Sequence, residues 1–424
     1  MTSGSLAGND SFVNRFPEII SCLYFAAETE ESEATDVAGH KRHKKHTYTL
    51  DTIPEGIPTK QVEHRLEGEV LVCPQCGDTM TEIDKEVVKT LEIIPARYIV
   101  REDIYYTYAC KSCGENADEG CEKPVVKAPR EKKIIPGSFA TPEAIAYIMT
   151  QKFAMGSPLY RQEQELNRRG IQLSRQTMSN WILRATEDYL TPIYDRLHEE
   201  LLKREVLHAD ETTLQVFHDP GKAPKSNSYM WLYRTSGDTD RPIVLYEYQP
   251  GRGGKHPKEF LAGFHGYLHT DGYTGYHNLP EEITVVGCWA HTRRKFDEAV
   301  KSLPKGKAKD SSTPKSALGK ASTYLNEQWP YLTNYLKDGR LELSNNRAER
   351  SIKPFVIDRK NFLFANTPKG AKGSAIMFGL VQTAIENGLD PYQYLTWLLK
   401  TANTADLDDI EVVQSRADIF WNDI

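Results

Sequence analysis

The sequence predicts an α/β fold in which a mixed core follows a small cysteine-bearing module and a helical segment. Three observations support this class. From residue 206 onward, short apolar runs alternate with longer amphipathic stretches, which is the pattern of strands and helices in turn. Two of the apolar runs end in an aspartate, and four cysteines form two pairs of identical spacing.

Length and charge limit the number of domains and the classes of partner that the chain can have. The chain has 424 residues, enough for two to four units. No apolar run reaches the roughly 18 to 20 residues of a membrane span, and no signal peptide is visible, so we expect a cytoplasmic protein with no membrane partner. The net charge is −6, but residues 28–36 hold five acids and residues 406–424 hold six acids and one base. The remainder carries 52 bases against 48 acids, which leaves room for a basic surface.

Residues 1–70 predict a mostly disordered leader. They contain the acidic run at 28–36 and the basic run at 40–46, with few strand or helix signals. The basic run is either an arm that contacts phosphates or a solvated linker.

The module at residues 71–115 carries the paired cysteines, each pair separated by two residues and followed by glycine: Cys73, Cys76, Cys110 and Cys113. This spacing lets both thiolates of a pair face one ion, so one structural Zn²⁺ is favoured over redox dithiols or unliganded thiols. Alternating β-branched and aromatic residues between 87 and 108 predict a small hairpin. The remaining cysteines, Cys22, Cys121 and Cys288, are interpreted as structural.

Residues 137–203 predict a helical region. Thr141 followed by Pro142 is a typical helix start. Residues 158–169, the turn at Gly170 and residues 174–181 suggest a helix-turn-helix whose second helix could enter a major groove. An ordinary helical hairpin that packs apolar residues is the alternative.

The core, residues 204–374, predicts strands at 206–209, 213–217, 229–234, 242–248, 267–270 and 284–288, with helices at 258–264 and 289–300. Antiparallel strands followed by alternating strands and helices, with acids at strand ends, are the order expected of an RNase H-like α/β fold. That order places Asp210 and Asp271 on neighbouring strands.

Three acids in this core predict a metal site. Asp210 and Asp271 each follow a strand-like run, and Glu349 lies at the start of a helix capped by serine or asparagine. Carboxylates are costly to bury unless something compensates them. Two aspartates and a glutamate from separate elements are what two Mg²⁺ ions need for in-line phosphoryl transfer. Composition alone does not choose Asp210 over the neighbouring Glu211.

The end of the chain is simpler. Residues 302–315 predict a flexible connector, 317–336 a helix, and 359–364 a strand flanked by paired bases. The segment 375–424 predicts helix with a break between Gly388 and Pro391, followed by an acidic tail.

Ordered motifs across residues 40–400 resemble the transposases of bacterial insertion-sequence family 66. They include the cysteine pairs, Pro158-Leu-Tyr-Arg-Gln, Ser174-Arg-Gln-Thr-Met-Ser-Asn-Trp, Ala209-Asp-Glu-Thr, Thr270-Asp-Gly-Tyr, Gly287-Cys-Trp-Ala-His-Thr-Arg-Arg-Lys-Phe, Asn345-Asn-Arg-Ala-Glu-Arg, Arg359-Lys-Asn-Phe-Leu-Phe and Asn387-Gly-Leu-Asp-Pro. Compared with the family, the chain looks shortened at the N-terminus, where no heptad repeat is visible, and in the insertion between Phe296 and Pro314.

The resemblance implies a DDE transposase whose catalytic residues are Asp210, Asp271 and Glu349, with two Mg²⁺ ions for catalysis and one structural Zn²⁺. It implies element-end and target DNA as partners, a homo-oligomer on DNA, accessory proteins from the same element, and association with the nucleoid. Candidate phosphate contacts are Arg293, Arg294, Lys295, Arg350, Lys353, Arg359 and Lys360. The alternatives are a catalytically defective zinc-dependent DNA-binding relic and a structure-specific nuclease on the same fold.

Overall fold

The computed structural model describes Gln75 and residues 97–109, 125–302 and 316–404. They fall into two compact units, one running from Glu31 to Arg130 and the other containing Glu131 and the residues that follow. No helix among the described residues is long and apolar enough to cross a membrane.

The first unit contains a two-stranded antiparallel sheet. Strand β1 (Thr107–Ala109) pairs with β2 (Val125–Lys127), with Tyr108 opposite Val126. The hairpin predicted between the two cysteine pairs differs from this arrangement, because residues 97–106 form no strand and the partner of β1 lies beyond the second pair.

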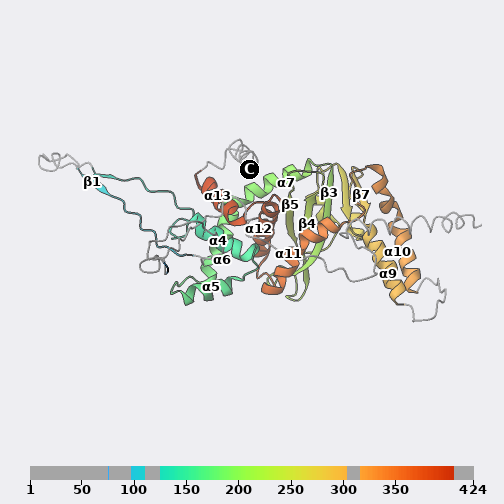
Figure 1. Ribbon diagram of the computed structural model, residues 1–424, viewed down its shortest axis with the longest axis horizontal. Coiled ribbons are helices and arrows are strands. Elements are labelled where there is room, and N and C mark those ends of the chain that lie inside the picture. Colours follow the sequence, from blue (N-terminus) through green and yellow to red (C-terminus); the bar gives the residue numbers. More distant parts are fainter. Residues whose placement is uncertain (1–74, 76–96, 110–124, 303–315, 405–424) are drawn as a thin grey trace, which may run out of the picture. The chain divides into compact units, whose positions relative to one another are not determined.

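The second unit is built on a five-stranded mixed sheet (Figure 1). Its strands are β3 (Val206–Gln215), β4 (Asn227–Thr235), β5 (Val244–Gln249), β6 (Gly266–Thr270) and β7 (Ile283–Gly287). The spatial order is β5-β4-β3-β6-β7. The β3–β4 and β4–β5 pairs are antiparallel, whereas β6 runs parallel to both β3 and β7. The predicted α/β class is therefore confirmed.

Helices cover both faces of this sheet. On one face, α11 (Asn346–Phe362) and α12 (Pro368–Glu386) are bonded to the strands through Arg234, whose guanidinium contacts Ser351 of α11 and Glu386 of α12. On the other face, Tyr233 stacks on Phe260 of α8 (Lys255–Phe260) at a ring separation of 3.9 Å. Because neighbouring residues of a strand point to opposite faces, Arg234 and Tyr233 identify the two sides.

The helical region precedes the sheet. It comprises α4 (Pro142–Phe153), α5 (Leu159–Arg168), α6 (Arg175–Ala185), the π-helical turn η3 (Thr186–Leu190) and α7 (Thr191–Leu202). Thr141 caps α4 as predicted, since its side chain accepts the backbone N–H of Ala144.

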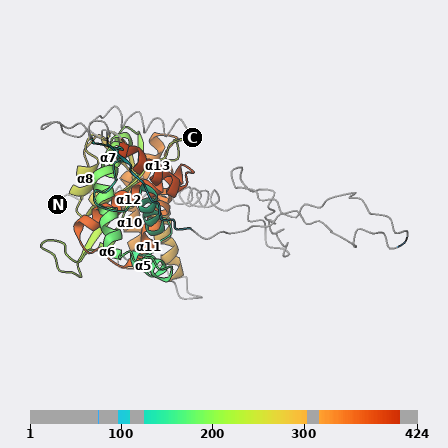
Figure 2. The same ribbon diagram turned by 90° about the vertical axis from the view of Figure 1, so that its left-hand side faces the viewer.

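Helix α12 joins the helical region to the sheet. It lies among the other helices at the centre of Figure 2, and most of its side chains from Ala371 to Ala384 are buried. Phe378 packs edge-on against Phe153 of α4 and also contacts Tyr246 of β5. After a turn at Gly388, whose φ is +74°, α13 (Pro391–Thr404) follows, which confirms the predicted break.

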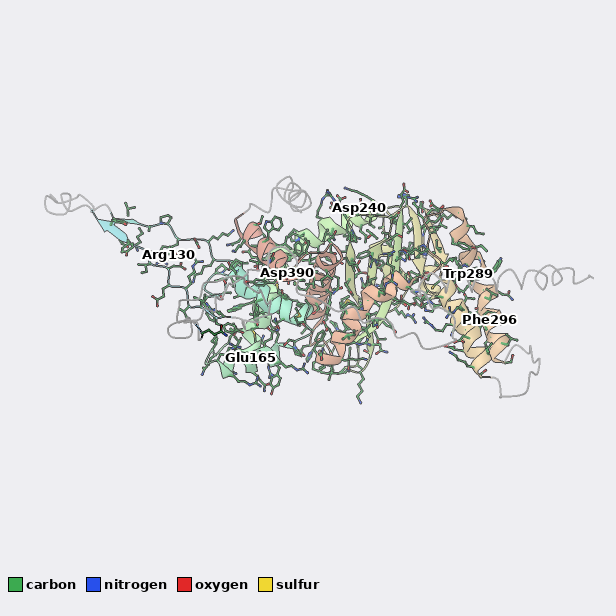
Figure 3. The ribbon with its side chains drawn as sticks, in the orientation of Figure 1. Arg130, Glu165, Asp240, Trp289, Phe296 and Asp390 are labelled. Atoms are coloured by element: carbon green, nitrogen blue, oxygen red, sulfur yellow. The ribbon has the colours of Figure 1, made fainter. Side chains whose placement is uncertain are left out.

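A helical pair flanks the β7 edge of the sheet. Helix α9 (Trp289–Lys301) packs against α10 (Ala317–Leu332), and the short 3₁₀ helix η5 (Thr333–Lys337) contacts β7 and α10. A second 3₁₀ helix, η4 (Thr274–Tyr276), contacts α8. Trp289 and Phe296 of α9, labelled in Figure 3, belong to the small apolar cluster formed with α10. The indole N–H of Trp289 donates to the carbonyl of Leu332 at 3.0 Å.

Three predicted strands require correction. Residues 206–209 and 213–217 were expected to be separate, but β3 is continuous through Asp210 because its antiparallel ladder with β4 extends to Gln215. Residues 359–364 were expected to form a strand, but α11 continues to Phe362. The chain then turns at Leu363, whose φ is +55°, and Ala365 forms a single bridge to Val216.

Candidate active site

The register of β3 and β6 places two aspartates side by side. His208 of β3 is paired with His269 of the parallel strand β6, and the two imidazole rings stack at 4.4 Å. Asp210 lies two residues further along β3, on the face of the sheet to which His208 points, and Asp271 directly follows Thr270, the last residue of β6. The charge of Asp271 raises the pKa of Asp210, so the two carboxylates lie close enough to interact.

Glu349 reaches the same face from α11. It lies in the first turn of that helix, and the helix packs on β3 and β4. The residue that fastens the start of α11 to the sheet is Asn345, which is 1% exposed. Its Nδ2 donates to the carbonyl of Ala209 at 2.8 Å, and its Oδ1 lies 3.0 Å from His208 Nδ1. The three acids therefore converge from β3, from the end of β6 and from α11.

The electrostatics of the cluster agree with this convergence. Burial raises the pKa of Asp210 well above its ordinary value, and the Glu211, Asp271 and Glu349 carboxylates raise it further. The backbone N–H of Glu211 donates to Asp210 Oδ1 at 2.8 Å and opposes the shift. Asp210 thus lies within reach of three like charges.

Glu211 points to the opposite face and is held there by two partners. Arg252 Nε donates to Glu211 Oε1 at 2.8 Å, and the Tyr276 hydroxyl donates to Oε2 at 2.7 Å. Burial, together with the charge of Asp271, raises the pKa of Glu211. Because both oxygens of Glu211 have protein partners, its neighbour Asp210 is the better-placed metal ligand of the two.

The donor set on the Asp210 face fits Mg²⁺. It consists of carboxylate oxygens, which hard divalent cations prefer. Glu349 Oε1 is buried and has no hydrogen-bond partner, so its lone pairs are uncompensated. A cation between the three acids would offset both the repulsion around Asp210 and the unpaired oxygen.

A second group of possible ligands lies at the end of β7. One atom from each of Cys288, His291 and Glu349 lies within 4.8 Å of the other two, the one such group among the described residues. Cys288 was interpreted as a structural thiol, and it is indeed buried. The signal that points to more than packing is the spacing of Cys288 and His291, which places two ligands on one side of the start of α9.

The predicted phosphate contacts lie on two helices. Arg293, Arg294 and Lys295 are exposed on α9, and Arg350, Lys353 and Lys360 are exposed on α11. Arg294 Nη2 lies 3.8 Å from Glu349 Oε2, which links the basic face of α9 to the acid cluster. Arg359 differs from the others, because it is only partly exposed and its Nη1 donates to the Thr213 hydroxyl at 2.8 Å.

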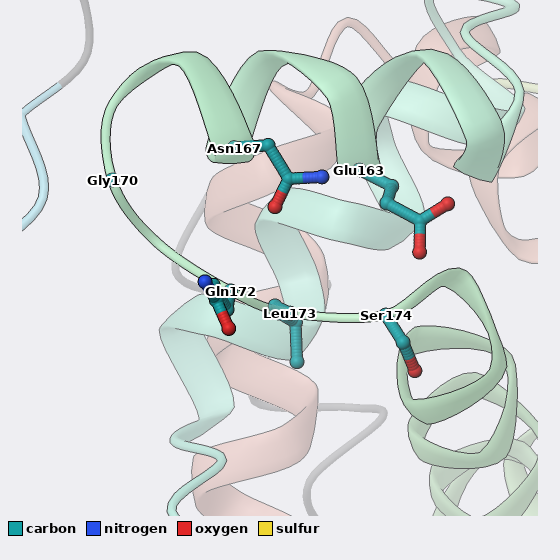
Figure 4. Close-up of a pocket in the computed structure, with 6 residues that line it drawn as sticks. All are labelled: Glu163, Asn167, Gly170, Gln172, Leu173 and Ser174. Carbon is teal, nitrogen blue, oxygen red and sulfur yellow. The ribbon is translucent and has the colours of Figure 1, made fainter.

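The α5–α6 pair has the connection expected of a helix-turn-helix. Figure 4 shows the turn through Gly170, whose φ is +80°, with Glu163, Asn167 and Ser174 around the hollow between the helices. Ser174 caps α6 by accepting the N–H of Thr177. The zinc ligands predicted at Cys73, Cys76, Cys110 and Cys113 lie outside the described residues.

Comparison with family models gives two matches. A model described as "Transposase IS66 family" matches residues 137–313 and 306–373, which is more than half of the chain. A model described as "zinc-finger binding domain of transposase IS66" matches residues 71–114, the segment that holds the paired cysteines.

Among individual proteins, three from Sinorhizobium fredii are similar to the chain, and all three carry the name of an uncharacterised protein. The first, y4jD, is 28% identical over 82% of this chain and 77% of its own length. The second, y4qI, is 32% identical over 65% and 62%, and the third, y4hP, is 26% identical over 88% and 78%.

Among solved structures, a chain of a pre-cleavage Mos1 transpososome is 12% identical over 58% of this chain and 85% of that chain. Its TM-score is 0.15, a value too low to say anything about the fold.

Proposed function

The chain belongs to the IS66 transposase family, and on this premise we propose that it cleaves and transfers DNA strands with two Mg²⁺ ions held by Asp210, Asp271 and Glu349. The family and its zinc-finger domain agree with the resemblance that the motifs carried. The observation that supports the catalytic proposal best is the parallel register of His208 with His269, because Asp210 and Asp271 each follow two residues later in the chain.

The proposal includes an RNase H-like core. Its support is the strand order β5-β4-β3-β6-β7, in which three antiparallel strands are followed by two strands parallel to β3. In this proposal Asp210 lies on the central strand, Asp271 directly after its parallel neighbour β6, and Glu349 on the helix that packs on β3.

Each acid has a distinct role in the proposal. Asp210 is central and would hold both ions, while Asp271 and Glu349 would each complete the coordination of one. Bound there, the ions would activate a water or a DNA 3′-hydroxyl and stabilise the leaving oxygen. Asn345 keeps the start of α11 against β3 and so sets the position of Glu349 relative to Asp210.

Phosphate binding would come from the exposed cations of α9 and α11. Arg293, Arg294 and Lys295 lie in the first half of α9, Arg350 and Lys353 lie near Glu349 in the first half of α11, and Lys360 lies in the last turn of that helix. Such contacts position DNA without reading its sequence. Arg359, bonded to Thr213, would contribute mainly by holding α11 to β3.

Two further segments complete the proposed DNA-binding apparatus. The four paired cysteines would hold one Zn²⁺ in the zinc-finger domain. The first turn of α6 would read DNA, because Ser174, Arg175 and Gln176 are exposed there while Met178 and Trp181 are buried against the other helices.

The test is Mg²⁺-dependent cleavage and strand transfer on labelled DNA that carries the terminal sequences flanking the gene. We expect Asp210→Asn to abolish both products, because the central ligand is lost. The matched control is Asp297→Asn, which removes an exposed acid of α9 paired with Lys301 and leaves the products unchanged.

The products also separate this proposal from its alternatives. Nicks without joined strands would indicate a nuclease, and binding without any cleavage would indicate a defective DNA-binding protein. Equal activity of the natural chain and Asp210→Asn would refute the assignment of the site.

A further inference from the structure

The group formed by Cys288, His291 and Glu349 has the donors of a transition-metal site. It offers a sulfur, an imidazole nitrogen and a carboxylate oxygen, all within 4.8 Å of one another. A tetrahedral Zn²⁺ holds such ligands at roughly 2.0 to 2.3 Å, which separates them by about 3.5 Å. Movements of about 1 Å by the His291 and Glu349 side chains, which are 23% and 32% exposed, would therefore close the site.

Local structure prepares two of the three ligands. Cys288 precedes α9 and His291 lies one turn later, so the two face the same side of the helix start. The Cys288 sulfur accepts the backbone N–H of Asn345 at 3.1 Å, which connects it to the segment that leads to Glu349. Burial raises the pKa of the Cys288 thiol, and this backbone contact opposes the rise.

Uncompensated atoms provide an independent indication. His291 Nδ1 and Glu349 Oε1 are both buried without a hydrogen-bond partner. His291 Nε2 approaches Glu349 Oε1 at 3.6 Å, too far for a hydrogen bond. Buried polar atoms without partners are rare in folded proteins, and several at one place suggest a missing ligand.

We propose that Cys288, His291 and Glu349 form a second Zn²⁺ site, distinct from the paired cysteines, which takes Glu349 away from the Mg²⁺ site. Thiolate and imidazole select a borderline-soft cation over Mg²⁺. Three protein ligands leave the fourth position open. The inhibitory part of this inference rests on the proposed function, whereas the existence of the site does not.

The sheet order explains why the two sites compete. Strand β6 lies between β3, which carries Asp210, and β7, which leads to Cys288. Glu349 therefore stands between a carboxylate pair on one side and a sulfur–imidazole pair on the other. With Zn²⁺ bound at the β7 side, its carboxylate is drawn from Asp210, and Mg²⁺ loses one of its three ligands.

The first experiment counts zinc. The full chain is equilibrated with Zn²⁺ at a fixed free concentration, and bound metal per chain is measured for the natural protein, Cys288→Ala and His291→Ala. We expect one zinc ion fewer in each variant. The control is His265→Ala, an exposed histidine outside the group, which keeps the full count. Equal zinc content in the natural protein and in His291→Ala would overturn the site, even if Cys288→Ala fails to fold.

The second experiment measures competition. Zn²⁺ is titrated into the DNA cleavage reaction at constant Mg²⁺, and each protein is compared with its own rate without Zn²⁺. Inhibition of His291→Ala should need at least about tenfold more free Zn²⁺ than inhibition of the natural chain. Identical inhibition curves would overturn the competition. If no protein cleaves DNA, the proposed function fails, while the zinc count still decides the site.

Discussion

Replacement of Asn345 by alanine is the most direct test of how the site is assembled. Asn345 is buried at the junction of β3 and α11. The carbonyl of Ala209 can only accept, so the amide nitrogen of Asn345 must face it, and Oδ1 must accept from His208 Nδ1–H. The alanine variant leaves both the carbonyl and the imidazole N–H without a partner.

The expected loss follows from those two groups. Each buried donor or acceptor left unpaired costs about 1 to 3 kcal/mol, so Asn345→Ala should lower the free energy of unfolding by roughly 2 to 5 kcal/mol. Urea denaturation followed by tryptophan fluorescence measures it. Asn326→Ala, at an exposed position of α10, serves as the control and should change stability by less than about 0.5 kcal/mol.

A second variant, Asn345→Asp, separates the hydrogen bonds of Asn345 from the packing of its side chain. If Asn345 positions Glu349, Asn345→Asp should restore only part of the free energy of unfolding that Asn345→Ala loses. A carboxylate accepts from His208 but cannot donate to the Ala209 carbonyl. A loss below about 1 kcal/mol in Asn345→Ala would refute the reasoning, since the two bonds would then contribute no more than solvent does.

Three further predictions concern stability. Burial raises the pKa of Glu247 to about 7, so the folded state loses stability as pH rises from 4.5 through 7 and this carboxyl group ionises. Glu247→Gln should therefore have a free energy of unfolding up to about 3 kcal/mol above that of the natural chain at pH 8 and nearly equal to it at pH 4, as measured by urea denaturation. Glu386→Ala should cost roughly 2 to 4 kcal/mol, because it leaves the buried Arg234 guanidinium without its carboxylate; an unchanged urea midpoint would contradict this. Gly156→Ala should cost roughly 1 to 3 kcal/mol in thermal unfolding, since φ is +64° and the new methyl group meets Asp358 Oδ1.

The sequence predicted which strands and helices form the core better than it predicted the residues at which they end. The apolar run before Asp210 and the polar residues after it suggested that a strand ended there. In the structure only the parallel pairing with β6 ends near that point, at His208, while the antiparallel pairing with β4 continues to Gln215. Composition along one strand does not reveal that its two neighbours stop at different places.

The predicted strand at residues 359–364 failed for a different reason. The Phe-Leu-Phe pattern after Lys360 is typical of a strand, but these residues end a helix whose apolar side, including Ile352 and Phe355, packs on the sheet. Tertiary packing outweighed local propensity here, as it does for many short segments.

The interpretation of Cys288 shows the limit of local patterns most clearly. Its burial could be expected, since an unpaired cysteine behaves as a small apolar side chain. Its proximity to Glu349 could not, because 60 residues separate the two in the chain and only the fold brings Cys288 next to the segment that begins α11.

The alternation of side chains along β3 favours Asp210 over Glu211 as the proposed metal ligand, a choice that composition left open. Consecutive residues of β3 point to opposite faces, and the His208 side is the one that α11 covers. Glu211 on the far side is neutralised by Arg252 and bonded by Tyr276, whereas Asp210 is surrounded by other acids. The variant Asp210→Asn, which removes the carboxylate at position 210 and keeps Glu211, should therefore lose Mg²⁺-dependent cleavage completely. Glu211→Gln should reduce it only through weaker packing around Tyr276, so cleavage that depends on Glu211 as strongly as on Asp210 would refute this assignment.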